Sequence, residues 1–192
     1  MVKRISIYID GANFVYGMKS LSPKYSDYHF DFEIFIKKII GENDLIDILY
    51  YNASLKQAIN PRRFKEQQKL LARLKKITKC KVVLCKRQKR VDADEKEYYI
   101  IKGDDIHLAL DMLRDACKDK YDKAILISGD GDFTQLVNYV RQEKKEVDIY
   151  AFKDLTSVDL INKANKHFWI DKKMVNKFFW REKKKIKNNK SQ

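Results

Sequence analysis

The chain has 192 residues, of which 41 are basic and 27 acidic, so its formal net charge is +14. A hydrophobic content of 44%, with only six glycines and two prolines, predicts one ordered domain with a full core and excludes a fibrous or disordered chain. The positive charge favours a polyanionic partner, with nucleic acid first and an anionic membrane surface second.

The spacing of the cysteines and the length of the apolar runs indicate where in the cell the protein is found. The three cysteines match no zinc or redox pair, and their odd number does not suggest a disulfide framework. The first residues enter an apolar strand without a signal-peptide pattern. No apolar run approaches the roughly 18 residues of a membrane span. We therefore expect a cytoplasmic protein with reduced thiols and no membrane span.

The predicted elements follow from apolar periodicity. The predicted strands cover residues 4–9, 45–51, 81–85, 98–101, 124–127 and 147–152, and residues 168–170 are expected to form a short strand or an edge turn. The predicted helices cover residues 32–40, 61–77, 104–117, 133–140 and 155–164. Residues 10–17 and 86–96 are expected to be loops, and residues 18–30 an irregular excursion. Because strands and helices alternate, we predict an α/β fold with a parallel sheet and helices on both faces.

The composition changes near the end of the chain. Residues 172–192 hold nine basic side chains and one acidic one, and apolar residues at Met174, Val175 and Phe178 indicate an amphipathic helix. We expect one domain over residues 1–171, followed by a basic C-terminal helix and tail over residues 172–192.

Acidic residues stand at three junctions between a predicted strand and a helix. Asp10 is at the first, Asp104 with Asp105 at the second, and Asp130 with Asp132 at the third. In a parallel sheet these junctions share one edge, where the carboxylates would repel one another unless a divalent cation such as Mg²⁺ or Mn²⁺ bound them. Helix capping is the alternative for each aspartate taken singly, since Asp is a preferred N-cap.

Three motifs carry a resemblance to a known family. They are Ile9-Asp10-Gly11-Ala12-Asn13-Phe14, Lys102-Gly103-Asp104-Asp105, and Ser128-Gly129-Asp130-Gly131-Asp132-Phe133. Their order and spacing resemble the NYN domain of the PIN-like nuclease superfamily, which includes the LabA-like proteins. The resemblance implies a three-layer α/β/α, Rossmann-like (PIN-like) fold with a central parallel sheet. It also implies a divalent-metal site, Mg²⁺ or Mn²⁺, with nuclease activity, usually on RNA.

The resemblance also assigns site residues, position by position. The implied catalytic residues are Asp10, Asn13, Asp105, Asp111, Asp130 and Asp132, and the implied metal ligands among them are Asp10, Asp105, Asp130 and Asp132. The family often has an apolar residue where Asp104 stands, so this extra acid either joins the metal site or caps the helix. Asp111 has a solvated or core-edge acid as its alternative.

Basic residues are concentrated in one part of the sequence. Residues 56–96 contain 15 basic and four acidic side chains, which favours a phosphate-binding surface beside the acidic site. The alternative for the helix at 62–76 is a solvated face. The predicted nucleic-acid-binding residues are Lys86, Arg87, Lys89, Arg90 and Lys102.

These features predict a metal-dependent ribonuclease, with DNA as a substrate not excluded because both nucleic acids present the same phosphates. The alternative is a non-catalytic RNA-binding regulatory module with the same fold, since capping explains each aspartate alone. A third hypothesis, attachment of the basic tail to an anionic membrane, depends on the aromatic residues Phe178, Phe179 and Trp180 beside lysines.

Overall fold

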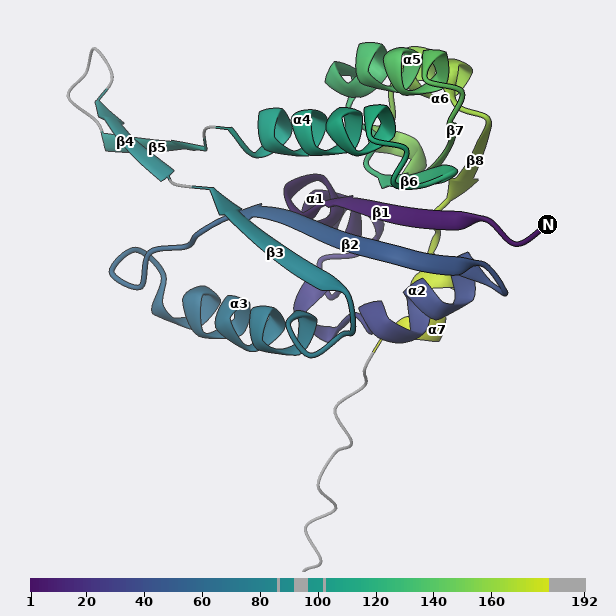
Figure 1. Ribbon diagram of the computed structural model, residues 1–192. Helices are drawn as coiled ribbons and strands as arrows, with labels where there is room; N and C mark the ends of the chain where they lie inside the picture. The colour runs from purple at the N-terminus through teal and green to yellow at the C-terminus, as the bar shows by residue number, and fades with distance from the viewer. Residues whose placement is uncertain (86, 92–96, 102, 180–192) are drawn as a thin grey trace, which may run out of the picture.

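A six-stranded sheet forms the centre of the protein (Figure 1). The computed structural model describes residues 1–85, 87–91, 97–101 and 103–179. Every strand pair in this sheet is parallel, in the order β3-β2-β1-β6-β7-β8. The strands are β1 (Arg4–Asp10), β2 (Asp44–Ala53), β3 (Cys80–Cys85), β6 (Lys123–Ile127), β7 (Glu146–Ala151) and β8 (Lys166–Trp169).

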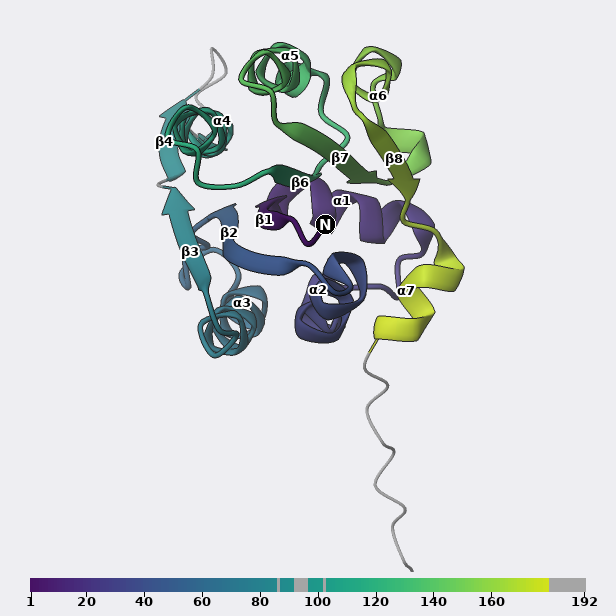
Figure 2. The same ribbon diagram turned by 45° about the vertical axis from the view of Figure 1, so that its right-hand side comes forward.

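Helices cover both faces of the sheet (Figure 2). One layer holds α1 (Gly11–Leu21), α2 (Phe32–Ile40), α3 (Pro61–Leu74) and α7 (Lys172–Phe178). The other holds α4 (Asp104–Cys117), α5 (Thr134–Gln142) and α6 (Val158–Lys163). Short 3₁₀ turns lie at η1 (Asp27–His29), η2 (Gly131–Phe133) and η3 (Lys153–Leu155). The predicted three-layer α/β/α fold is therefore confirmed.

Strand alternation divides the core into two halves. Ile5, Ile7 and Ile9 of β1 face the layer of α1, α2, α3 and α7, whereas Tyr8 faces α4 and α5. Both faces of β1 are thus buried, as expected for a central parallel strand. The buried β1 and β6 fix the positions of the residues that follow them.

Helix α1 starts at Gly11, so the predicted exit loop over residues 10–17 is wrong. Asp10 is the N-cap, and its carboxylate accepts a hydrogen bond from the Asn13 amide at 2.9 Å. Gly17 lets this helix approach the sheet layer, since a Cβ there would lie 1.9 Å from the ring of Phe152. The two glycines concealed the helical pattern in the sequence.

A hairpin of β4 (Arg87–Val91) and β5 (Glu97–Ile101) replaces part of the loop predicted over residues 86–96. The sequence of β4, Arg-Gln-Lys-Arg-Val, has no apolar alternation, so its strand character comes from antiparallel backbone pairing with β5. The hairpin leaves the sheet after β3 and enters α4 (Figure 1).

The short helix α7 packs onto the domain. Val175 is fully buried, and the Asp31 amide donates a hydrogen bond to the Phe178 carbonyl at 2.7 Å. The Phe178 ring also contacts Phe30 and Phe35. The helix predicted from residue 172 is present, while residues 180–192 of the predicted tail lie outside the described residues. No helix in the described part is long and apolar enough to cross a membrane.

Candidate active site at the carboxyl edge of the sheet

The first strand and the sixth end side by side. Ile9 of β1 pairs with Ile127 of β6 in parallel register, so Asp10 and Ser128 leave the sheet together. In the sheet, β2 lies on one side of β1 and β6 lies on the other, so the order of the strands reverses at β1. This is the point in an open parallel sheet where ligands bind.

Asp10 is held by hydrogen bonds on both carboxylate oxygens. The Asn13 amide donates to Oδ1 and the Ser128 hydroxyl donates to Oδ2, each at 2.9 Å. Asp10 as a whole residue is 5% exposed. Burial raises the pKa of Asp10 to about 6, although both hydrogen bonds oppose the shift, and the charges of Asp104 and Asp130 add to it.

Asn13 is oriented by the loop after β6. The Gly129 amide donates to Asn13 Oδ1 at 3.1 Å, which leaves the Asn13 Nδ2 group as a donor. A Cβ on Gly129 would lie 2.5 Å from the Leu155 carbonyl oxygen, so only glycine fits at this close approach. Asn13 and Gly129 line an open groove together with Asp130, Thr156 and Ser157.

The third acidic junction is a compact turn. The Asp130 amide donates to Ser128 Oγ at 3.1 Å, and Asp130 Oδ1 accepts from the Asp132 amide at 3.0 Å. Asp130 therefore caps η2, as Asp10 caps α1. The capping alternative describes real contacts of both residues, and it leaves their other lone pairs available.

The second acidic junction opens α4. Its N-cap is Gly103, whose left-handed backbone (φ 92°) provides no side-chain cap. Asp104 is 8% exposed, and its charge raises the pKa of both Asp10 and Asp105. Asp104 therefore lies among the acids, in the first turn of α4 and not at its N-cap position.

Asp105 shows most directly that the carboxylates of the three junctions repel one another. Desolvation raises its pKa to about 6, and the charges of Asp104, Asp10, Asp130 and Asp132 add to the shift in that order. The structure thus brings together the acids of all three junctions. Within the described residues, however, no three His, Cys, Asp or Glu side chains are arranged as they stand to coordinate one ion.

Asp111 is placed differently from the other predicted site residues. It lies on α4, where the Tyr51 hydroxyl donates to its Oδ2 at 2.9 Å and Arg114 pairs with its Oδ1 at 2.6 Å. It is absent from the main contributors to the pKa shifts of Asp10 and Asp105. Its catalytic role stays a prediction.

Three of the five predicted phosphate-binding residues lie on the hairpin. Arg87, Lys89 and Arg90 belong to β4, and Arg90 is exposed. Lys86 and Lys102 lie outside the described residues. Because β5 ends three residues before Asp104, the hairpin is joined directly to the acidic edge.

Ser128 is the contact that sequence reasoning missed. Its hydroxyl bridges the first and third junctions, because it donates to Asp10 and accepts from the Asp130 amide. Only the pairing of β1 with β6 could have indicated this contact, because it places the residues that follow the two strands next to each other.

Comparison with known proteins identifies the family. The NYN domain profile matches residues 4–171. The chain belongs to the NYN domain family. Members of this PIN-like family are generally nucleases, which indicates a nuclease with a nucleic-acid substrate.

A solved structure shares the fold of this NYN domain. It is a protein of unknown function from Vibrio parahaemolyticus, with a TM-score of 0.71 and 27% sequence identity. The alignment covers 89% of this chain and 94% of that one. The comparison with curated proteins gives no match.

Proposed function

We propose that this NYN domain protein is a metal-dependent ribonuclease that hydrolyses phosphodiester bonds at its acidic edge. The observation that carries the proposal is the grouping of acids from three junctions around Asp10 and Asp105, whose pKa values are both raised to about 6. Carboxylates that repel one another in this way are stabilised by a bound cation.

The donor set fits a hard divalent ion. All candidate ligands are carboxylate oxygens, which Mg²⁺ and Mn²⁺ prefer. Asp10, Asp105, Asp130 and Asp132 would hold the ion, with Asp104 beside them. When bound, such an ion would stabilise developing phosphate charge and lower the pKa of an attacking water.

The chain's own residues position the substrate in this proposal. Asn13, whose Oδ1 is held by Gly129, points its amide donor at a phosphate oxygen. Ser128 keeps Asp10 oriented through its 2.9 Å hydrogen bond. The basic hairpin then attracts the RNA backbone next to the acids, where each Lys or Arg neutralises phosphate charge.

A second candidate function is RNA binding without cleavage. One observation favours it, namely that no three acidic, cysteine or histidine side chains in the described part stand ready to coordinate one ion. A binding module, however, gains nothing from carboxylates that repel both one another and the phosphates of RNA.

The test is cleavage of an end-labelled RNA, with a DNA of the same sequence beside it, in Mn²⁺, Mg²⁺ or EDTA. The proteins are the wild type, Asp10→Asn, and Asp44→Asn as a matched control on the opposite edge of the sheet. The proposal expects metal-dependent cleavage by wild type and Asp44→Asn that is lost in Asp10→Asn. Tight RNA binding without cleavage, equal in all three proteins, would favour the binding module. Cleavage of DNA in preference to RNA would overturn the substrate class.

A further inference from the structure

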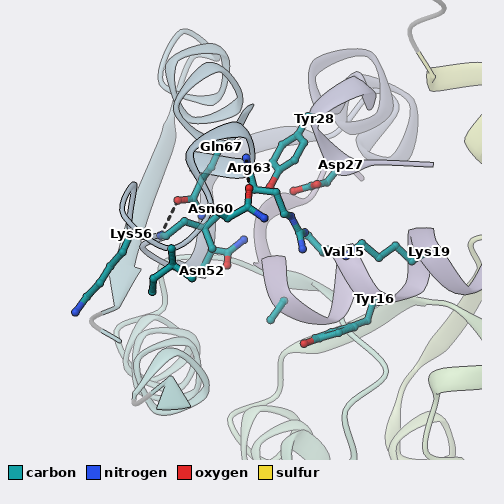
Figure 3. A pocket seen from close by; sticks show the side chains of 13 residues that line it. Val15, Tyr16, Lys19, Asp27, Tyr28, Asn52, Lys56, Asn60, Arg63 and Gln67 are labelled. Carbon is teal, nitrogen blue, oxygen red and sulfur yellow. Dashed lines mark hydrogen bonds between the residues drawn. The ribbon is translucent and has the colours of Figure 1, made fainter. Parts of the chain in front are cut away.

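A second hollow lies next to the groove beside Asp130, on a neighbouring face of α1. It has a volume of about 260 Å³ and is enclosed by α1, η1, the segment after β2 and the first turns of α3 (Figure 3). We call it the Asp27 cavity, after the one carboxylate in its wall. Its size is near the lower end of the range for small-ligand sites, roughly 300 Å³.

The Asp27 cavity lies close to the proposed catalytic acids. Ala12, two residues after Asp10, is part of its wall. Desolvation is the main cause that raises the pKa of the buried Tyr50 hydroxyl, and the negative charges of Asp27 and Asp10 raise it further. Both carboxylates are therefore near enough to Tyr50 to act on it electrostatically. Tyr16 lines both the Asp27 cavity and the groove beside Asp130.

Several polar groups in the cavity wall are already paired within the protein. The Gln67 side chain donates to the Ala53 carbonyl and accepts from the Leu55 amide, each at 2.9 Å. Asn60 caps α3 by accepting from the Arg63 amide at 3.0 Å. Gln67 and Asn60 therefore make a rigid wall and are poor candidates for ligand selection.

Asp27 differs from these paired groups. The residue is 2% exposed, and Oδ2 has no hydrogen-bond partner among the described residues. A buried carboxylate oxygen without a donor costs free energy unless something supplies one. Burial raises the pKa of Asp27 to about 6, while the charge of Arg63, hydrogen bonding from the Asp27 and Tyr28 backbone amides, and the charge of Lys19 oppose the shift. Figure 3 shows the Asp27 carboxylate turned toward Arg63.

The rest of the wall supplies cations and aromatic surface. Lys19 extends from α1 and Arg63 from α3, while Tyr28 stands beside Asp27 (Figure 3). Tyr16, 67% exposed, is an aromatic face between the two hollows. An acceptor within a cationic rim, with aromatic rings at hand, suits a nucleotide, since bases of single-stranded RNA are read by stacking and by hydrogen bonds to their edges.

We propose that the Asp27 cavity binds a guanine base of the RNA next to the bond that is cleaved. Guanine presents two adjacent donors, N1–H and the N2 amino group, which match the two oxygens of one carboxylate. Adenine and cytosine present a single amino group on the corresponding edge, and uracil presents one N–H. Arg63 and Lys19 hold the nucleotide's phosphate at the rim. This inference rests on the proposed ribonuclease function, since it names the base that the nuclease selects.

The experiment measures binding of the four nucleoside 5′-monophosphates to the full chain by calorimetry in EDTA, where no cleavage occurs. Wild type is expected to bind GMP about tenfold or more tighter than AMP, CMP or UMP. Asp27→Asn should lose this preference, because an amide replaces one acceptor with a donor. Arg63→Met should weaken all four nucleotides alike, and Asp44→Asn, which removes the same charge at the far edge, should change nothing.

Equal binding of the four nucleotides by wild type, or a GMP preference that survives in Asp27→Asn, would overturn the inference. Circular dichroism checks the fold of each variant, and if Asp27→Asn is unfolded, the wild-type ranking and Arg63→Met decide the question. Cleavage of RNA with and without guanosine separates the two proposals. Cleavage without a GMP preference refutes only the guanine site, whereas a GMP preference without cleavage of any RNA refutes only the nuclease.

Discussion

Replacing Asp10 by asparagine should stabilise the metal-free protein, although it removes a proposed catalytic group. A folded-state pKa of about 6, against an ordinary value of 3.8, corresponds to a cost of about 3 kcal/mol for the ionised side chain at neutral pH. Asparagine carries no charge and avoids that cost. It keeps one acceptor oxygen for either Asn13 or Ser128, so it loses one hydrogen bond, which costs about 1 kcal/mol. The expected net gain is about 2 kcal/mol in the free energy of unfolding.

The raised pKa of Asp10 determines at which pH Asp10→Asn should be more stable than wild type. Folded wild type binds the Asp10 proton more tightly than the unfolded chain does, so the cost is fully present above pH 6 and disappears as the pH falls toward 4. Urea unfolding in EDTA should therefore show Asp10→Asn more stable than wild type at pH 7.5, with no gain at pH 4. Asp44→Asn is the control and should show no gain at either pH. An Asp10→Asn protein that is less stable than wild type at pH 7.5 would refute the reasoning.

The remaining predictions concern the loop, α4 and the hairpin. Gly129→Ala should lower the free energy of unfolding by about 1–3 kcal/mol, because the new Cβ would lie 2.5 Å from the Leu155 carbonyl oxygen. Gly131→Ala should lower it less, because the nearest atom to its new Cβ would be 3.1 Å away. Asp111→Asn should reduce RNA cleavage far less than Asp10→Asn, since Tyr51 and Arg114 hold Asp111; an equal loss would place Asp111 in the catalytic group. Exchange of four predicted phosphate-binding residues for serine should weaken RNA binding and flatten its dependence on salt, whereas exchange of Lys37 and Lys38 on α2 should not. The four residues are Lys86, Arg87, Lys89 and Arg90. Unchanged binding after the hairpin exchange would exclude the hairpin from the interface.

The sheet and most helices could be predicted because burial leaves a direct trace in the sequence. The unbroken run 124–127 comes from a strand covered on both faces, and the alternating Ile5, Ile7 and Ile9 are the side chains of β1 that face one half of the core. The junction acids followed from the same logic, since each stands directly after a strand or at the start of a helix. Asp104 could not be assigned from sequence, because only the structure shows that Gly103 occupies the cap position.

Features that depend on contacts distant in sequence were not predictable. Nothing in residues 18–30 distinguishes Asp27 from a surface acid, and its burial comes from its place in the wall shared by α1 and α3. The bridging contact of Ser128 likewise requires the neighbouring positions of β1 and β6. Strand β5 was predicted as the strand at 98–101, whereas β4 was missed because backbone pairing, with no apolar pattern in its sequence, defines it.

The measurement that tests the central claim most directly is Mn²⁺ binding, followed by electron paramagnetic resonance of the free ion. The proposed function predicts a Mn²⁺ site in wild type and in Asp44→Asn that is lost or greatly weakened in Asp10→Asn and in Asp105→Asn. The ion should also stabilise wild type against urea and leave Asp10→Asn unaffected, because only a folded state that binds the ion gains stability from it. Equal Mn²⁺ binding by all four proteins, or none by wild type, would contradict the proposal that these carboxylates form the metal site of a nuclease.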